Sequence, residues 1–339
     1  MRIGVEAWGI DHGSEAALGA PESTTAEVVE TGCETTSWAP VAPGEVGELG
    51  DLPVAFVDGT RRMDARLFVS ENGAAPLPGI AGSVGVGAVL CEPAPGGAGA
   101  RRIGRWWTGR RAEIARLDVH RYLVMGLGRT LELTAGPGLE YEALSHPDTD
   151  EGSLVDTVHD RMRALEAALA QELAGDEDTL VFVDGPLALM RPGALRVVGF
   201  IKAHHRRYLD PGHEATLAAL GCGERTPLFA FGEPRPRYSW YLRLCEVEDH
   251  HHSWHGVVRC ETPAALGLEA AKSLADGSAA ILPAFASAPH WDPRAPQNLV
   301  PVAGLEKRMR HLLGDRELIT RMIRSAARAM SEGGDLAAG

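Results

Sequence analysis

The sequence lacks the signatures of several well-defined protein classes. No run of about 18 apolar residues occurs without charge, so no membrane-spanning helix is expected. The first residues, Met1 to Glu6, lack the basic region and the long apolar run of a secretory signal peptide. No GxSxG, HExxH or GxxxxGK[ST] sequence is present, which argues against the usual serine hydrolases, zincins and P-loop NTPases.

Cysteine is scarce and positive charge is in deficit. The five cysteines form no CxxC pair, so we expect reduced, mostly buried thiols and a cytoplasmic protein. The net charge of −13 argues against a protein that coats nucleic acid nonspecifically. It does not exclude a nucleic-acid enzyme, because a carboxylate-rich metal site adds negative charge. Basic residues gather locally at 101–111 and 202–207, where they form either a binding surface or ordinary solvated charge.

The order of the expected elements favours an α/β fold with a sheet of mixed direction over a doubly wound parallel sheet. We expect a loosely ordered leader over residues 1–50, one domain over 51–330 and a frayed end over 331–339. The first three expected strands pair consecutively. Apolar runs and periodicity predict strands at 52–58, 61–70, 80–91, 179–184, 195–202, 237–247 and 256–261, and helices at 153–174, 212–220, 264–275, 303–313 and 315–330.

Two apolar segments with nearly the same sequence are the most informative feature. Phe56-Val57-Asp58-Gly59 and Phe182-Val183-Asp184-Gly185 each place an aspartate between an apolar run and a glycine. A carboxylate at a strand end lies at the edge of the sheet, where ligands can reach it, and glycine allows a sharp turn or a close approach. One such aspartate is often only a turn cap. Two matching copies favour a paired site.

Two carboxylates brought together repel each other, so we expect a divalent cation to neutralise them. Mg²⁺ and Mn²⁺ prefer hard oxygen ligands. The chemistry that then becomes available is phosphoryl transfer or phosphodiester hydrolysis.

A third carboxylate is expected on the helix predicted over residues 153–174. Ser153 is its expected cap, and Val158, Met162, Leu165, Leu169 and Leu173 form one apolar stripe. Glu166 and Glu172 lie on opposite shoulders of this stripe. Periodicity alone does not choose between them, and either is also acceptable as an ordinary boundary glutamate.

Together these segments resemble the NurA nuclease family, over roughly residues 50 to 325. Each segment is short, and the match lies in their order and spacing. The resemblance is carried by Asp58-Gly59-Thr60 after a strand, a glutamate on the helix before a second Asp-Gly strand end, Gly199-Phe200-Ile201-Lys202, the Arg- and Tyr-bearing run from Arg237 to Leu244, and the Pro-x-x-Leu-like run from Pro296 to Pro301.

The resemblance implies an RNase H-like core with additional strands and C-terminal helices. It also implies Mn²⁺ (or Mg²⁺) as cofactor, DNA as substrate, a homodimer, and a HerA-type hexameric ATPase as partner, in DNA repair or antiphage defence. It favours Glu166 over Glu172 and makes Asp58, Glu166 and Asp184 metal ligands. Lys202 and Tyr241 join them as catalytic residues at the scissile phosphate. The implied substrate-binding residues are Arg61, Lys202, Arg237, Arg243 and Asn298.

One departure from the family pattern concerns a histidine expected after the Pro-x-x-Leu segment. This chain reads Val300-Pro301-Val302-Ala303 there. His290 is the expected replacement as a metal ligand, with Asn298 or Glu306 as alternatives. The missing histidine motivates a rival function, a non-catalytic adaptor subunit for a DNA motor. An RNase H-like phosphotransferase or RNA nuclease is a second alternative.

A histidine-rich segment, Glu248 to His255, is expected to form a polar hairpin tip. A zinc site would need ligands spaced on a defined turn and a matching set elsewhere.

Overall fold

The computed structural model describes residues 28–43, 47–70, 75–93, 101–103, 106–108, 110–175, 179–187, 196–204, 206–232, 234–248, 251–290 and 292–335. Most of the expected leader, residues 1–27, and the last four residues of the expected frayed end lie outside them. No described helix is long and apolar enough to cross a membrane.

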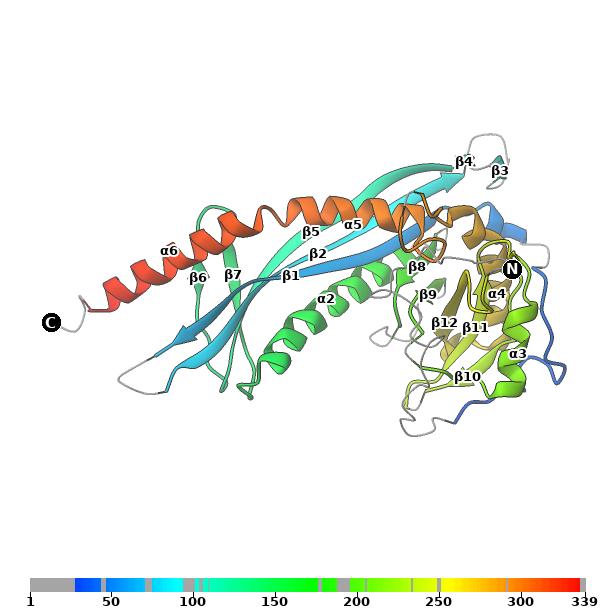
Figure 1. Ribbon diagram of the computed structural model, residues 1–339, viewed down its shortest axis with the longest axis horizontal. Helices are drawn as coiled ribbons and strands as arrows, with labels where there is room; N and C mark the ends of the chain where they lie inside the picture. The colour runs from blue at the N-terminus through cyan, green and yellow to red at the C-terminus, as the bar shows by residue number, and fades with distance from the viewer. Residues whose placement is uncertain are drawn as a thin grey trace, which may run out of the picture. The chain divides into compact units, whose positions relative to one another are not determined.

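The fold is α/β, built on a ten-stranded mixed sheet flanked by helices (Figure 1), as the sequence predicts. The strand order is β10-β11-β12-β9-β8-β1-β2-β5-β7-β6, and β3 and β4 form a separate two-stranded antiparallel sheet. The strands are β1 Val54–Val69, β2 Leu77–Pro93, β3 Arg101–Ile103, β4 Trp106–Thr108, β5 Arg110–Met125, β6 Leu133–Thr134, β7 Glu140–Ser145, β8 Leu180–Asp184, β9 Val197–Ile201, β10 Phe229–Phe231, β11 Arg237–Arg243 and β12 Val257–Pro263.

The helices agree in place with the amphipathic segments of the sequence. They are α2 Glu151–Ala174, α3 Pro211–Ala219, α4 Leu268–Ile281, α5 Val300–Leu312 and α6 Arg316–Asp335, with short 3₁₀ turns at Gly47–Gly50, Ala264–Leu266 and Leu282–Phe285. The start of α2 differs from the expectation in one detail. Asp150, not Ser153, caps it, since an Asp150 carboxylate oxygen accepts the backbone N–H of Ser153 at 3.1 Å.

The chain divides into two compact units, and some of the boundaries between them fall inside continuous strands or helices. Unit 1 contains residues 1–57, 88–115 and 167–304, and unit 2 contains residues 58–87, 116–166 and 305–339. Strand β1 passes from unit 1 to unit 2 between Val57 and Asp58, and helix α5 does so between Gly304 and Leu305.

Unit 1 is organised around parallel strands β1, β8 and β9, with antiparallel strands β12, β11 and β10 beyond them. The β11–β12 pair is formed by two of the expected strands, those predicted at residues 237–247 and 256–261. Aromatic rings fill the core around β1 and β8: Phe56 stacks on Phe182 with ring centroids 5.6 Å apart, and Phe285 meets Phe56 edge-on at 4.7 Å.

The segments 52–58 and 61–70 do not form two paired strands. They belong to one strand, β1, which continues through Asp58 and Gly59 for 16 residues. The expected strand end at Asp58 was wrong, because Gly59 serves the close approach of another segment rather than chain reversal. A Cβ added there would clash with the carboxylate of Glu166 and lie 2.9 Å from Cγ of Met162. Gly185 does terminate its strand, with a φ of +119° that favours glycine.

Unit 2 has its own core, in which α6 covers the sheet. Ile319 and Ile323 of α6 pack against buried side chains of β2, β5, β6 and β7. A buried polar cluster lies beside this core. Asp64 accepts hydrogen bonds from the hydroxyl of Tyr141 at 2.9 Å and from Nε of Arg62 at 2.9 Å, and from Ser83. Arg62 also donates to the carbonyls of Leu313 and Gly314, so it satisfies the end of α5.

Part of the expected leader makes specific contacts in unit 1. Glu34 forms a two-pronged ion pair with the buried guanidinium of Arg225 at 2.8 and 2.9 Å. Short β-bridges join Glu30 to Ala230 and Val41 to Arg225. The sequence of this segment has weak periodicity, because its order comes from partners about 190 residues away. The five cysteines, all within the described residues, form no disulfide.

Candidate metal centre

The pairing of β1 with β8 sets the two aspartates beside each other along the backbone. The strands run parallel, and the register aligns Val54 with Leu180 and Val57 with Val183. Asp58 and Asp184 are the next residues on the two strands. Strand β8 ends at Asp184 whereas β1 continues beyond Asp58, so only one of the two aspartates terminates its strand.

A third carboxylate comes from helix α5. One ligand oxygen each from Asp58, Asp184 and Glu306 lies within 4.8 Å of the other two. Asp58 is 6% and Glu306 9% exposed, and Asp184 is half-buried. Three hard oxygen donors at this spacing match the ligand chemistry of Mg²⁺ or Mn²⁺. The sequence offered Glu306 only as an alternative to His290, since no local pattern on α5 links it to the strand ends.

A lysine and an amide extend from Asp184 within unit 1. Lys202, one residue after β9, forms an ion pair with Asp184 and donates to Oδ1 of Asn298 at 2.9 Å. The amide nitrogen of Asn298 donates in turn to Asp292 at 2.5 Å. Burial alone would raise the pKa of Asp292, but the hydrogen bonds from Asn298 and the backbone of Arg294 bring it below its ordinary value. Asp292 therefore acts as a charged anchor for Asn298, a role that the sequence analysis did not assign.

Glu166 lies on α2 within unit 2 and is 7% exposed, whereas Glu172 on the same helix is exposed. Its carboxylate packs onto the backbone at Gly59, next to Asp58. It is not a member of the three-carboxylate group, whose third member is Glu306. This placement suits either a metal ligand or a nearby acidic group that influences metal affinity through its charge.

Replacing Gly59 with alanine tests the role of Glu166. The added methyl group overlaps the carboxylate of Glu166 and lies 2.9 Å from Cγ of Met162, so we expect both side chains to move at a cost of about 1–3 kcal/mol in stability. If Glu166 supports metal binding, the Mn²⁺ affinity measured by isothermal titration calorimetry falls by about 10–100-fold, the usual effect of disturbing an outer-shell partner. An unchanged affinity, with Glu166→Gln equally silent, would make Glu166 a packing residue.

His290 lies on an exposed turn and is not a member of the carboxylate group. Among the described histidines of the segment 248–255, His251 and His255 stack with ring centroids 3.7 Å apart, and none belongs to a three-ligand group in the described part of the chain.

Two residues expected at the scissile phosphate are buried in unit 1. Tyr241 is 1% exposed and packs among Phe229, Trp254 and Leu217, and its burial raises the pKa of its hydroxyl. Arg243 is fully buried, and its guanidinium donates to the backbone carbonyls of Leu217, Ser253 and His255. Burial lowers the pKa of Arg243. These partners leave Arg243 with a structural role. Tyr241 and Arg243 share one face of β11, whose other face, with Trp240 and Leu242, is also buried.

The remaining expected substrate contacts occupy different settings. Arg61 is exposed on β1 in unit 2. Arg237 in unit 1 pairs with the buried carboxylate of Glu261 at 3.0 Å and stacks over Phe231 at 4.9 Å. Asn298 is fully buried and accepts a hydrogen bond from Lys202, the partner of Asp184.

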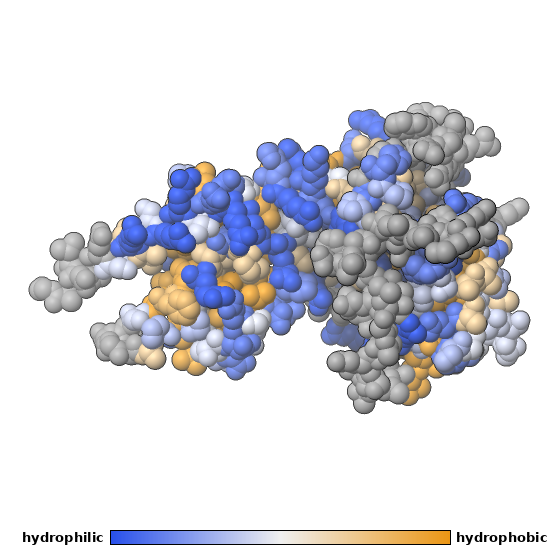
Figure 2. Space-filling view, viewed as in Figure 1, coloured by the Kyte–Doolittle hydropathy of each residue, from blue (hydrophilic) through white to orange (hydrophobic). Residues whose placement is uncertain are grey.

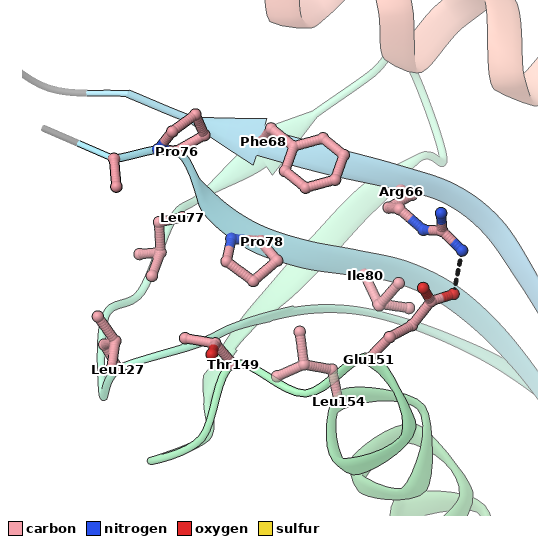
Figure 3. A pocket seen from close by; sticks show the side chains of 11 residues that line it. Arg66, Phe68, Pro76, Leu77, Pro78, Ile80, Leu127, Thr149, Glu151 and Leu154 are labelled. Atoms are coloured by element: carbon pink, nitrogen blue, oxygen red, sulfur yellow. Dashed lines mark hydrogen bonds and ion pairs between the residues drawn. The ribbon is translucent and has the colours of Figure 1, made fainter. Parts of the chain in front are cut away.

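Unit 2 also contains a pocket of about 470 Å³ (Figure 3). Its wall is mostly apolar, formed by side chains such as Phe68, Leu77, Ile80, Leu127 and Leu154. Its two charged residues, Arg66 and Glu151, form an ion pair with each other. None of its lining residues belongs to the carboxylate group, so the pocket is separate from the candidate metal centre.

No protein-family model matches the chain, and no curated protein matches it in sequence. The function must therefore be argued from the chemistry of the site.

Proposed function

We propose that this protein is a metal-dependent DNA nuclease of NurA type, acting in the cytoplasm. The observation that carries the proposal is the convergence of Asp58, Asp184 and Glu306, with oxygens within 4.8 Å of one another. The resemblance of the strand ends and of the Gly-Phe-Ile-Lys segment to the NurA family supports DNA as the substrate and an RNase H-like core as the fold.

The residues at the site divide into ligands and a phosphate-binding group. Asp58, Asp184 and Glu306 would hold one or two Mn²⁺ or Mg²⁺ ions, with Glu166 nearby beside Gly59. Such ions supply a lowered pKa for bound water and neutralise charge on a phosphodiester. Lys202 pairs with Asp184 and is held by Asn298, which Asp292 anchors, and this supports a role for the Lys202 cation in binding a substrate phosphate. Lys202 would orient the phosphate and offset its developing charge.

A non-catalytic adaptor subunit is the second candidate. It is favoured by the burial of Tyr241 and Arg243, which removes two of the expected substrate contacts, and by the absence of His290 from the carboxylate group. Under either function we propose a homodimer and a HerA-type hexameric ATPase as partner, because the site itself supplies no energy for movement along DNA.

Purified full-length protein with linear DNA and Mn²⁺ separates the two functions. The nuclease should release nucleotides or short fragments with Mn²⁺, more slowly with Mg²⁺, and not with EDTA. RNA of the same sequence should be degraded at least about tenfold more slowly, since DNA specificity is part of the proposal. Protein that is inert on DNA with each metal, alone and with the ATPase, would leave only the adaptor function.

A further inference from the structure

Helices α5 and α6 carry a surface whose charge is opposite to that of the whole protein. Residues 305–331 contain seven lysines and arginines but three acidic residues, in a chain of net charge −13. Figure 1 shows α6 following α5 nearly end to end, and Figure 2 shows hydrophilic residues gathered over both helices. The exposed cations, which define the α5–α6 basic surface, are Lys307, Arg308, Arg310, Arg316, Arg321, Arg324 and Arg328.

The fold of unit 2 fixes the orientation of the arginines on α6. Arg321, Arg324 and Arg328 follow i, i+3, i+7 spacing, so they form one stripe. Ile319 and Ile323 lie on the opposite side of the helix and pack into the core of unit 2. The stripe therefore faces solvent on a helix anchored through its other face.

Few acidic groups neutralise this surface. Arg310 contacts Glu306 at 3.5 Å, and Asp315 is engaged in capping the first turn of α6 through the N–H of Leu318. Glu317 precedes Arg321 by one turn, but no acidic residue follows on the stripe before Ser331, the last residue of α6 whose side chain is described. Other arginines of unit 2 differ, since Arg66 and Arg116 pair with carboxylates.

The basic surface begins next to Glu306 in the sequence of α5. Glu306, one of the three carboxylates of the candidate metal centre, is followed directly by Lys307 and Arg308 on α5. Along α6, the distance from Arg321 to Arg328 is about 10 Å at 1.5 Å per residue. This is about the axial rise over three nucleotide steps of one DNA strand, at roughly 3.4 Å per step.

We propose that the α5–α6 basic surface binds the phosphate backbone of DNA beyond the segment held at the metal centre. The inference rests on the proposed function and deepens it by assigning a second substrate contact. A nucleic acid fits better than a membrane, because an interfacial helix inserts its apolar face into lipid and the apolar face of α6 is already packed against the sheet. Phosphate contacts of this kind add affinity without reading sequence.

The test compares two triple variants of the full chain with the same change in net charge. Arg321→Gln/Arg324→Gln/Arg328→Gln removes the stripe, and Arg129→Gln/Arg161→Gln/Arg163→Gln removes three exposed arginines elsewhere in unit 2. Affinity for a fluorescein-labelled duplex is measured by anisotropy in EDTA, where no cleavage occurs, over a series of salt concentrations. Anionic phosphatidylserine vesicles and RNA of the same sequence are measured alongside.

The stripe variant should bind the duplex at least about tenfold more weakly at low salt, and its slope of log affinity against log salt should fall by up to about 2.7 units. The control should stay within about twofold, and Arg321→Lys/Arg324→Lys/Arg328→Lys should retain binding, since the charge persists. Equal loss in both Gln variants, or wild-type protein that does not bind DNA, would overturn the inference. So would a loss seen for vesicles or RNA but not for DNA. Nuclease turnover of the wild type is measured separately, so failure of the stripe leaves the proposed function intact.

Discussion

Replacing Asp58 with asparagine is expected to lower the Mn²⁺-dependent rate of linear-DNA degradation by about a thousandfold or more. Asp58 supplies one of three oxygens that meet within 4.8 Å, and an amide at this position lacks the charge that holds a divalent ion. Bound metal contributes several kcal/mol to phosphodiester hydrolysis, and about 4 kcal/mol corresponds to a thousandfold in rate.

A second measurement separates loss of metal binding from loss of folding. Mn²⁺ at about 100 times its dissociation constant should stabilise the wild-type protein by about 2.7 kcal/mol, seen as a rise in melting temperature. The rise should vanish in Asp58→Asn and Asp184→Asn. In EDTA, Asp58→Asn should keep its melting temperature or gain slightly from reduced repulsion, whereas Asp184→Asn should melt at a lower temperature because its ion pair with Lys202 is lost.

Glu172→Gln is the matched control for these two variants. It also replaces one carboxylate by an amide, but Glu172 is exposed and does not belong to the carboxylate group. It should keep both the activity and the thermal response to Mn²⁺. Wild-type activity that survives in Asp58→Asn would remove the carboxylate group from the mechanism.

Arg243→Met is expected to lower the free energy of unfolding by about 3–5 kcal/mol, with no direct effect on the affinity for DNA. The guanidinium of Arg243 is fully buried and donates to three backbone carbonyls, at 2.6 Å for Leu217 and 2.7 Å for Ser253, and to His255. Methionine fills a similar volume but donates nothing, and each buried acceptor left unsatisfied costs about 1–3 kcal/mol. The effect is measured as a shift of the urea unfolding midpoint followed by circular dichroism.

Two further variants test the structural role of Arg243. Arg207→Met removes an exposed arginine that pairs with Glu214 at 3.5 Å, a partly solvated ion pair, so it should cost less than about 1 kcal/mol. Arg243→Lys keeps the charge but not the planar fork, so its stability should fall between those of the wild type and Arg243→Met. If Arg243→Lys unfolds like the wild type yet binds DNA more weakly, the side chain contacts substrate after all.

The burial of Arg243 shows why the sequence pattern misled for β11. The run Arg237 to Leu244 contains polar and aromatic residues that are common to binding strands and to central strands with buried polar groups. The environment of each side chain depends on α3 and on residues 251–256, which pack against β11 from elsewhere in the chain. No periodicity within β11 carries that information.

The surroundings of Asp58 were likewise not predictable from the local sequence. Its apolar run and following glycine predicted a strand end, but β1 continues and Gly59 instead accommodates Glu166 from α2. The aspartate was the right residue to single out, since its chemistry is local. That Asp58 lies within β1 whereas Asp184 ends β8 is decided by the packing of distant segments.

The sequence by itself determined the α/β class, the helices α2, α5 and α6, and the two aspartates after matching apolar runs. These features follow from hydrophobic periodicity and residue chemistry, which act over a few neighbouring residues. Only the tertiary structure decided that Glu306 completes the carboxylate group, that Asn298 and Asp292 hold Lys202, and that Tyr241 and Arg243 belong to the core. The physical reason is that burial, ion pairing and ligand geometry depend on which distant segments pack together.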